Sequence, residues 1–168
     1  MKIKMKKVVI GLVVLGLFAV IPAWSQQDKF SLNFGLHTNI CESGSFDDVA
    51  FTLDARFSSK LSKPLNISFE LMTMYNYGSF FPWGMHIWVI YPGVMLNYEF
   101  GRWFVGLGAV WPFIIGEGEV DVMTPAPKLN VGYTFGRWQV TAYIITWTGE
   151  GYGFLDWNWA GLSLGYKF

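Results

Sequence analysis

The sequence contains few of the residues that usually stabilise or activate a small domain. Its 168 residues include one cysteine, Cys41, which excludes an internal disulfide. Only 14% of the residues are charged, and the two histidines, His37 and His86, are too far apart to indicate a zinc site. After residue 25, no apolar run reaches the roughly 20 residues of a membrane-spanning helix. Hydrophobic residues nevertheless make up 52% and aromatic residues 19% of the chain, so apolar side chains are dispersed along it.

Residues 1–25 have the pattern of a cleaved secretory signal peptide. A basic start precedes the apolar run 8–23, and small residues flank Trp24 just before residue 26. The run is shorter than a spanning helix requires, which favours cleavage over an uncleaved anchor. Cleavage removes four lysines and lowers the basic residues from 12 to 8, against 12 acidic residues, a net charge of −4. We therefore expect residues 26–168 to form one domain with no basis for binding nucleic acid.

Apolar and polar residues alternate in eight segments of this domain. In the last segment, 159–168, even-numbered residues are apolar or aromatic, while Gly161, Ser163, Gly165 and Lys167 have the other parity. Strict alternation places the two sets on opposite faces of a β-strand. The other expected strands begin near residues 30, 49, 65, 86, 103, 128 and 138. Eight tilted strands of about ten residues match a membrane hydrocarbon layer, and closure of the sheet pairs every backbone group.

Short turns and aromatic residues are expected at defined levels of this sheet. The segment 100–103, Phe-Gly-Arg-Trp, recurs at 135–138, and its glycine can supply the positive φ of a tight turn. We expect Tyr98 and Tyr133 to face the tryptophans that end these two segments. Aromatic residues near the turns would form one interfacial girdle. A second girdle, toward the loops, would contain Trp83, Trp88, Trp111, Phe113, Trp157 and Trp159.

The repeated alternation and the last strand, which ends in Phe168, resemble small eight-stranded bacterial outer-membrane β-barrels. The pattern is similar to the transmembrane domain of outer membrane protein A. This resemblance implies an all-β fold, a closed eight-stranded antiparallel up-and-down transmembrane β-barrel preceded by a cleavable signal peptide. It also implies location in the bacterial outer membrane, contact with its lipids, and recognition of the C-terminal strand by the barrel-assembly machinery. A soluble lipocalin-like barrel is the alternative, but too few charges remain outside loops and turns to solvate its wall.

Four charged residues, Asp54, Arg56, Glu70 and Lys128, have inward parity near the middle of their strands. An eight-stranded barrel is just wide enough for its own side chains to fill. Unpaired charges in such an interior are costly, so we expect a network of ion pairs. Arg56 should pair with Asp54 or Glu70, and Lys128 should reach a carboxylate across the barrel. This network would close the lumen; a narrow pore is the alternative.

The outer loops are acidic, whereas Lys60, Lys63, Arg102 and Arg137 lie in the expected periplasmic turns. This asymmetry suggests an outer surface that binds cations or basic partners. No carboxylate group has the complete spacing of a known calcium loop, so we expect no resident metal or cofactor. The acidic residues of the outer loops are Glu42, Asp47, Asp48, Glu117, Glu119, Asp121, Glu150 and Asp156.

The resemblance also includes barrels that modify lipid A, which raises an acyl hydrolase or acyltransferase as an alternative function. His37 is expected inside the barrel near a loop that contains Ser43, Ser45, Asp47 and Asp48. A nucleophilic site needs these groups in a defined geometry, and no His-x-Ser or Asp-Ser pair supports one. We therefore expect a barrel with a structural or surface-interaction role and not an enzyme.

Two prolines suggest a weak seam in the wall. Pro92 and Pro112 are expected in the loop-proximal halves of adjacent strands, where each removes a donor from the hydrogen-bond ladder. The sequence therefore predicts a bulge or a weak seam between these strands. Such a seam could admit a lipid laterally into the lumen.

Overall fold

The computed structural model describes residues 29–41, 49–77, 86–116, 119–147 and 157–168. The predicted signal peptide, residues 1–25, lies outside these ranges. Within them, no helix is long and apolar enough to cross a membrane. The described residues form ten strands: β1 (Lys29–Cys41), β2 (Val49–Lys60), β3 (Leu65–Tyr77), β4 (His86–Phe100), β5 (Trp103–Val110), β6 (Phe113–Gly116), β7 (Glu119–Val122), β8 (Ala126–Phe135), β9 (Trp138–Trp147) and β10 (Trp157–Lys167).

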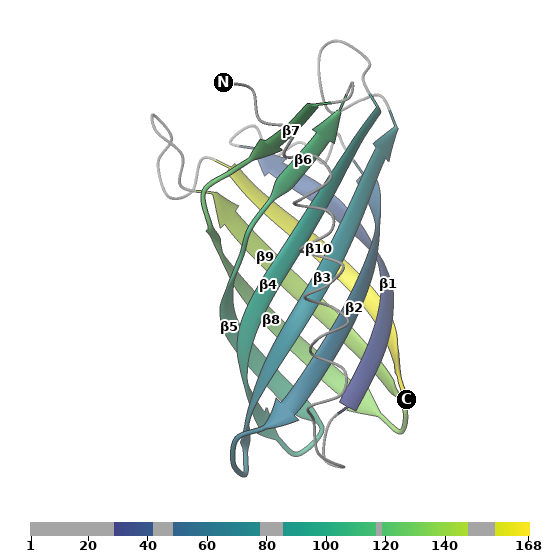
Figure 1. Cartoon of the computed structure of the whole chain (residues 1–168). Helices are drawn as coiled ribbons and strands as arrows, with labels where there is room; N and C mark the ends of the chain where they lie inside the picture. Colours follow the sequence, from purple (N-terminus) through teal and green to yellow (C-terminus); the bar gives the residue numbers. More distant parts are fainter. Residues whose placement is uncertain (1–28, 42–48, 78–85, 117–118, 148–156) are drawn as a thin grey trace.

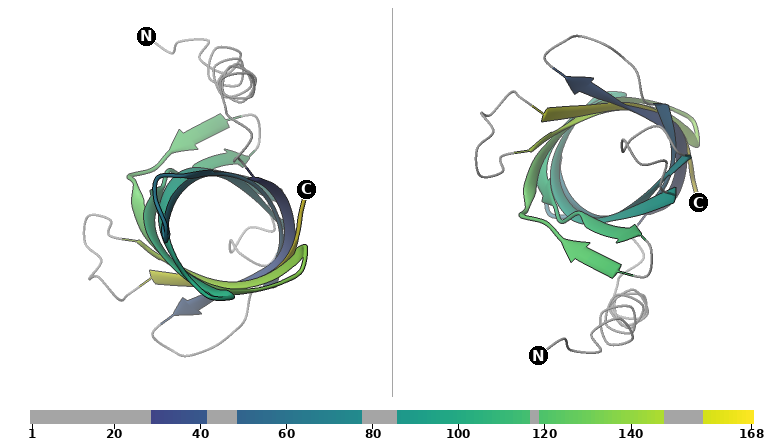
Figure 2. Two further views of the ribbon diagram at one scale, coloured as in Figure 1. Left: turned by 90° about the horizontal axis from the view of Figure 1, so that it is seen from below. Right: turned by 90° about the horizontal axis from the view of Figure 1, so that it is seen from above.

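Eight of these strands close into an antiparallel barrel, as the sequence predicts (Figures 1 and 2). Each strand of the ring pairs with its neighbours in chain order, from β1 through β5 and from β8 through β10. The first and last strands also pair, with Leu36 opposite Leu162, so the ring has no seam at the termini. Strands β6 and β7 continue β5 and β8 as a hairpin at the end of the barrel opposite the C-terminus (Figure 1).

The alternating residues explain which way the barrel wall faces. Phe34, Phe51 and Leu107 lie on the outside and are 59%, 61% and 60% exposed, whereas polar residues of the other parity, such as Asn33 and Thr52, are buried inside. This arrangement is the reverse of the lipocalin-like alternative, in which the apolar face lines the cavity. Burial of apolar surface contributes about 25 cal/mol per Å² when it leaves water, so an outer wall of this kind favours an apolar surrounding.

The two Gly-Arg turns form as predicted, with φ of 66° at Gly101 and 64° at Gly136. The expected partners of Tyr98 and Tyr133 were wrong, because the phenylalanine before each glycine pairs with the tryptophan after it. Tyr98 therefore lies opposite Val105, and Tyr133 opposite Val140.

The aromatic contacts of the turn end join neighbouring hairpins instead. Trp103 packs on Tyr133 with 4.9 Å between ring centroids, and Trp138 packs on Tyr166 at 5.1 Å. In the second of these contacts, Arg137 Nη1 also donates a hydrogen bond to Tyr166 Oη at 3.2 Å. The turn-end aromatics thus pack on one another across neighbouring hairpins, although their contacts differ from those expected.

The expected outer girdle is observed only in part. Trp88 and Trp111 are exposed on the outer wall, but Trp159 is 6% exposed and lies inside the barrel. Its odd number in β10 gives it the same inward parity as Ser163, which places the indole against His37. The side chains of Trp83 and Trp157 lie outside the described residues.

Between the described strands of Pro92 and Pro112, the predicted bulge is not observed. Pairing of β4 continues in one register from β5 into β6, and Trp111 N donates to Pro92 O at 2.9 Å. The register changes on the other side of Pro112, where residues 111–112 lie opposite residues 123–125. This extra residue is a β-bulge between β7 and β8, so the irregularity lies beside Pro112 and not between the strands of the two prolines.

The interior has two layers along the barrel axis. The layer toward the loops is mainly apolar, while the layer toward the turns contains amides, hydroxyls and charges. The apolar layer consists of Ala50, Met72, Met74, Val89, Tyr91, Val110, Ala126, Tyr143, Ile145 and Trp159.

Candidate functional site

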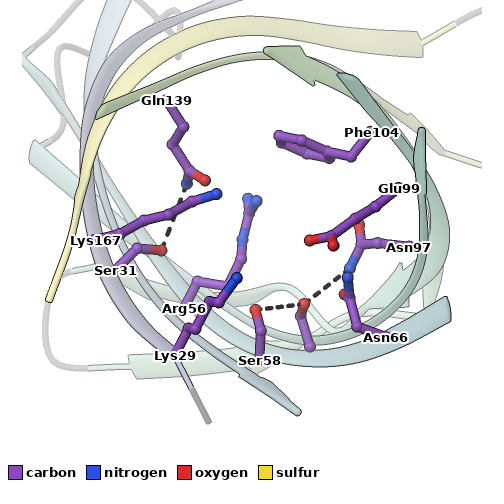
Figure 3. Close-up of a pocket in the computed structure, with 11 residues that line it drawn as sticks. Lys29, Ser31, Arg56, Ser58, Asn66, Asn97, Glu99, Phe104, Gln139 and Lys167 are labelled. Atoms are coloured by element: carbon purple, nitrogen blue, oxygen red, sulfur yellow. Dashed lines mark hydrogen bonds between the residues drawn. The ribbon is translucent and has the colours of Figure 1, made fainter. Parts of the chain in front are cut away.

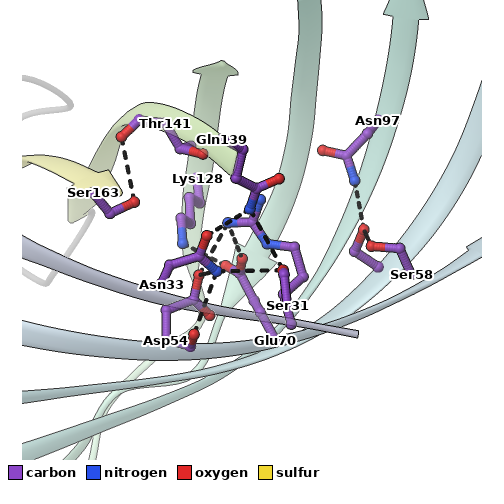
Figure 4. A network of polar contacts seen from close by, with 12 residues as sticks. Ser31, Asn33, Asp54, Ser58, Glu70, Asn97, Lys128, Gln139, Thr141 and Ser163 are labelled. Atoms are coloured by element: carbon purple, nitrogen blue, oxygen red, sulfur yellow. Dashed lines mark hydrogen bonds and ion pairs between the residues drawn. The ribbon is translucent and has the colours of Figure 1, made fainter. Parts of the chain in front are cut away.

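A cluster of four charged side chains crosses the lumen where the two layers meet (Figure 4). Arg56 Nη2 lies 3.1 Å from Asp54 Oδ2 and 3.3 Å from Glu70 Oε2. Lys128 Nζ donates to Glu70 Oε1 at 2.5 Å. Each of these four residues is at most 5% exposed. The contacts have the partners expected from the sequence, and the two cations balance the two carboxylates.

Strand register explains how the four side chains meet. Asp54 and Arg56 are two residues apart on β2 and therefore share its inner face. Glu70 lies directly opposite Arg56 on β3, where cross-strand side chains are close enough to interact. Lys128 comes from β8, which is not adjacent to β2 or β3 in the sheet, so its long side chain spans the interior. A charge pair this deeply buried requires such close partners to offset the loss of hydration.

Amide side chains extend the cluster to β1 and β9. Asn33 Nδ2 donates to Asp54 Oδ2 at 3.1 Å, and Gln139 Nε2 donates to Asn33 Oδ1 at 2.5 Å. Gly165 faces them on β10, where an added Cβ would collide with the Asn33 amide. Roles for Asn33 and Gln139 were not predicted, although their inward parity and the glycine in the closing strand were signals for them.

His37 lies above this cluster in the apolar layer. Its Nδ1 is 3.0 Å from Tyr143 Oη, and its ring is 4.8 Å from the ring of Trp159. Lys128 Nζ lies 4.7 Å from the centroid of the Tyr143 ring, within the range of a cation–π contact. His37 is 1% exposed, so the imidazole is enclosed by aromatic groups. Its expected loop neighbours Ser43, Ser45, Asp47 and Asp48 lie outside the described residues.

Most of the predicted acidic surface also lies outside the described residues. Asp121 is exposed on β7, opposite Ile114 of β6. Glu119 begins β7, and its side chain is not among those described. In the described ranges, no group of three or more His, Cys, Asp or Glu residues could hold a metal ion. The other predicted residues outside these ranges are Glu42, Asp47, Asp48, Glu117, Glu150 and Asp156.

No protein-family model matches the sequence, and no curated protein matches it. Solved structures do share the fold. Neisserial surface protein A, from Neisseria, is 13% identical over 84% of this chain and 96% of its own, with a TM-score of 0.56. A de novo designed transmembrane β-barrel is 9% identical over 83% of this chain and 95% of its own, with a TM-score of 0.53.

A third structure, the N-terminal β-barrel domain of Pseudomonas aeruginosa OprF, is 15% identical over 84% of this chain and 98% of its own, with a TM-score of 0.50. Identities this low show a shared fold alone. The closed ring of eight antiparallel strands and these similarities agree. The chain therefore has the fold of the small eight-stranded outer-membrane β-barrels.

Proposed function

We propose that the chain is an integral protein of the bacterial outer membrane whose lumen is closed by its own side chains. Its role would be structural or surface-interacting, through the acidic outer loops. The observation that supports this proposal most is the neutral, buried network of Asp54, Arg56, Glu70 and Lys128 across the interior of an externally apolar barrel.

Location in a membrane follows from the outer wall. Large apolar side chains on all eight strands of the ring are directed outward, including Leu53, Leu96 and Leu129. Closure of the ring pairs the backbone groups of these strands, which a hydrocarbon layer requires. The C-terminus lies at the end with the short turns (Figure 1), which would face the periplasm. The proposal includes export by residues 1–25 and assembly through the strand that ends at Phe168.

The two layers of the lumen support its closure. An ion entering from the turns would meet the paired charges and their amide partners. Beyond them it would meet buried Met72, Met74 and Tyr91, which offer an ion little solvation. Both layers oppose steady conduction, and this distinguishes the closed barrel from the alternative of a narrow pore.

Conductance in planar bilayers tests this closure. Wild-type protein should show little steady conductance, while Arg56→Ala should be leakier and less stable, because it leaves Asp54 and Glu70 with less compensation. Arg102→Ala is the matched control, since Arg102 is exposed at a turn. A large, stable wild-type conductance would instead support a pore.

The acidic outer loops would bind cations or basic partners. Exposed Asp121 on β7 supports a solvent-facing position for one of these carboxylates. Acid-to-amide changes at all eight predicted positions should weaken binding of Ca²⁺ or a cationic peptide, measured by calorimetry on the refolded barrel. Glu99→Gln, at the turn end of β4, is the control. Unchanged binding in the eightfold variant would remove this part of the proposal.

A further inference from the structure

The turn end of the lumen contains a polar cavity, which we call the vestibule (Figure 3). Its mouth lies where β1 begins and β10 ends, and its floor is formed by Arg56 and Gln139. Side chains from all sides of the barrel point into it in Figure 3. The vestibule is lined by Lys29, Ser31, Arg56, Ser58, Asn66, Ser68, Asn97, Glu99, Phe104, Gln139 and Lys167.

The vestibule has an excess of positive charge. The positive charge of Arg56 is balanced by its ion pairs with Asp54 and Glu70. On the turn side of Arg56 lie Lys29 and Lys167, with Glu99 as the acidic side chain of the lining. In the described part of the chain, no ion pair joins either lysine to a carboxylate. The lysines therefore bring two positive charges into a confined space that holds one negative charge.

Hydrogen-bond donors accompany these charges. Ser31 lies opposite Lys167 in the β1–β10 ladder, and Lys29 precedes Ser31 by two residues on the same face. Ser31 Oγ accepts hydrogen bonds at 3.5 Å from the amides of Asn33 and Gln139, so its own proton remains to donate. Lys167 Nζ donates to Thr134 Oγ1 at 2.9 Å and keeps further protons for another acceptor.

The floor contributes one more donor. Arg56 Nε is buried and has no hydrogen-bond partner among the described residues. Figure 3 shows the Arg56 side chain rising into the middle of the vestibule, between Gln139 and Ser58. Two ammonium groups, a hydroxyl and a guanidinium N–H thus converge from β1, β2 and β10.

We propose that the vestibule is a binding site for a phosphate group. A phosphate offers several acceptor oxygens and a negative charge, and its hydrogen bonds to ammonium and guanidinium groups are of the strong, charge-assisted kind. It would enter from the turn side, because the charge network closes the other side. The group could belong to free phosphate or to a phospholipid headgroup at the membrane surface.

Two titrations on the full barrel in an uncharged detergent distinguish these sources. One uses inorganic phosphate, and the other uses dihexanoyl phosphatidic acid below its micelle concentration, each at constant ionic strength. Backbone amide shifts of Lys29, Ser31 and Lys167 are followed by NMR. Saturation by phosphate identifies a site for the free anion, and saturation by the lipid alone identifies a headgroup site.

The double variant Lys29→Gln/Lys167→Gln should bind whichever probe saturates roughly tenfold more weakly, because it loses two charge-assisted partners. Lys60→Gln/Lys63→Gln is the matched control, since it removes the same charge from exposed residues near the β2–β3 turn. Heat-dependent gel mobility confirms that both variants are folded. The proposal is overturned if neither probe saturates the wild-type shifts, or if the two double variants bind equally.

Discussion

Lys128 shows how a barrel of this size can hold a full positive charge in its interior. The side chain is 1% exposed, and its ammonium group lies between Glu70 and the face of Tyr143. Removal of a single partner from a buried pair costs more than the pair itself contributes, because the remaining charge loses its compensation. Lys128 is therefore the residue at which the network can be tested with least change to the wall.

Lys128→Met should lower the free energy of unfolding by about 3–5 kcal/mol, since it leaves the Glu70 carboxylate with only Arg56 as a cationic partner. The double variant Lys128→Met/Glu70→Gln should recover at least about 1 kcal/mol of this loss. Urea-dependent unfolding in lipid vesicles measures both changes.

Lys60→Met, at an exposed position, should alter stability by no more than about 0.5 kcal/mol and serves as the control. If Lys128→Met behaved like this control, the buried ion pair would contribute nothing to stability. The ion pair of Lys128 with Glu70 would then not stabilise the charged layer of the lumen.

Parity along the strands predicted which charged residues point inward, because a β-strand has a period of two. The same rule places Trp159 inside. The expected aromatic girdle placed it outside, and that prediction was wrong. Contacts between side chains of non-adjacent strands, such as Gln139 with Asn33 over Gly165, depend on strand order and on the space left by glycines. Parity within a single strand does not contain that information.

Strand β8 ends its pairing with β9 at a proline. Thr134 N donates to Arg102 O, so the even-numbered amides of β8 face β5 and the odd-numbered amides face β9. Pro127 therefore lacks a donor toward β9, and the β8–β9 ladder stops at Lys128 opposite Ile145. Beyond this point the bulge takes β7 away from the ring, and Figure 2 shows β7 outside the circle of strands.

Pro127→Val should extend the β8–β9 ladder by one residue pair, because the backbone amide gained at position 127 faces Thr146. We expect slow hydrogen exchange at this new amide, measured by NMR. Exchange at Val131, an amide that faces β9 within the existing ladder, provides the reference rate. If the new amide exchanged as fast as an exposed loop amide, the proline would not be what ends the ladder.

The long strands of the ring could be predicted because each one has a regular apolar face. The β6–β7 hairpin could not, because Glu119 and Asp121 of β7 were expected in an outer loop and the bulge depends on one extra residue in one partner. The sequence predicted a bulge at Pro92 and Pro112, but the register of β4 with β5 and β6 is continuous there. A proline lacks a backbone donor. Whether this changes the register depends also on the residues of the paired strand.

The whole molecule combines an apolar exterior with a two-layered interior. Its charge network separates a polar vestibule near the turns from an apolar layer near the loops. This arrangement would need a hydrocarbon layer outside and would permit no continuous aqueous path inside. The proposed membrane location and the proposed closure of the lumen would thus be separate consequences of the same alternating sequence.

Heat-dependent gel mobility of the protein in outer-membrane fractions tests the folded barrel and its location together. The protein should sediment with the outer membrane, and its unboiled and boiled forms should migrate differently. Equal mobility of the two forms, with the protein in the soluble fraction, would contradict both the folded barrel and its membrane location.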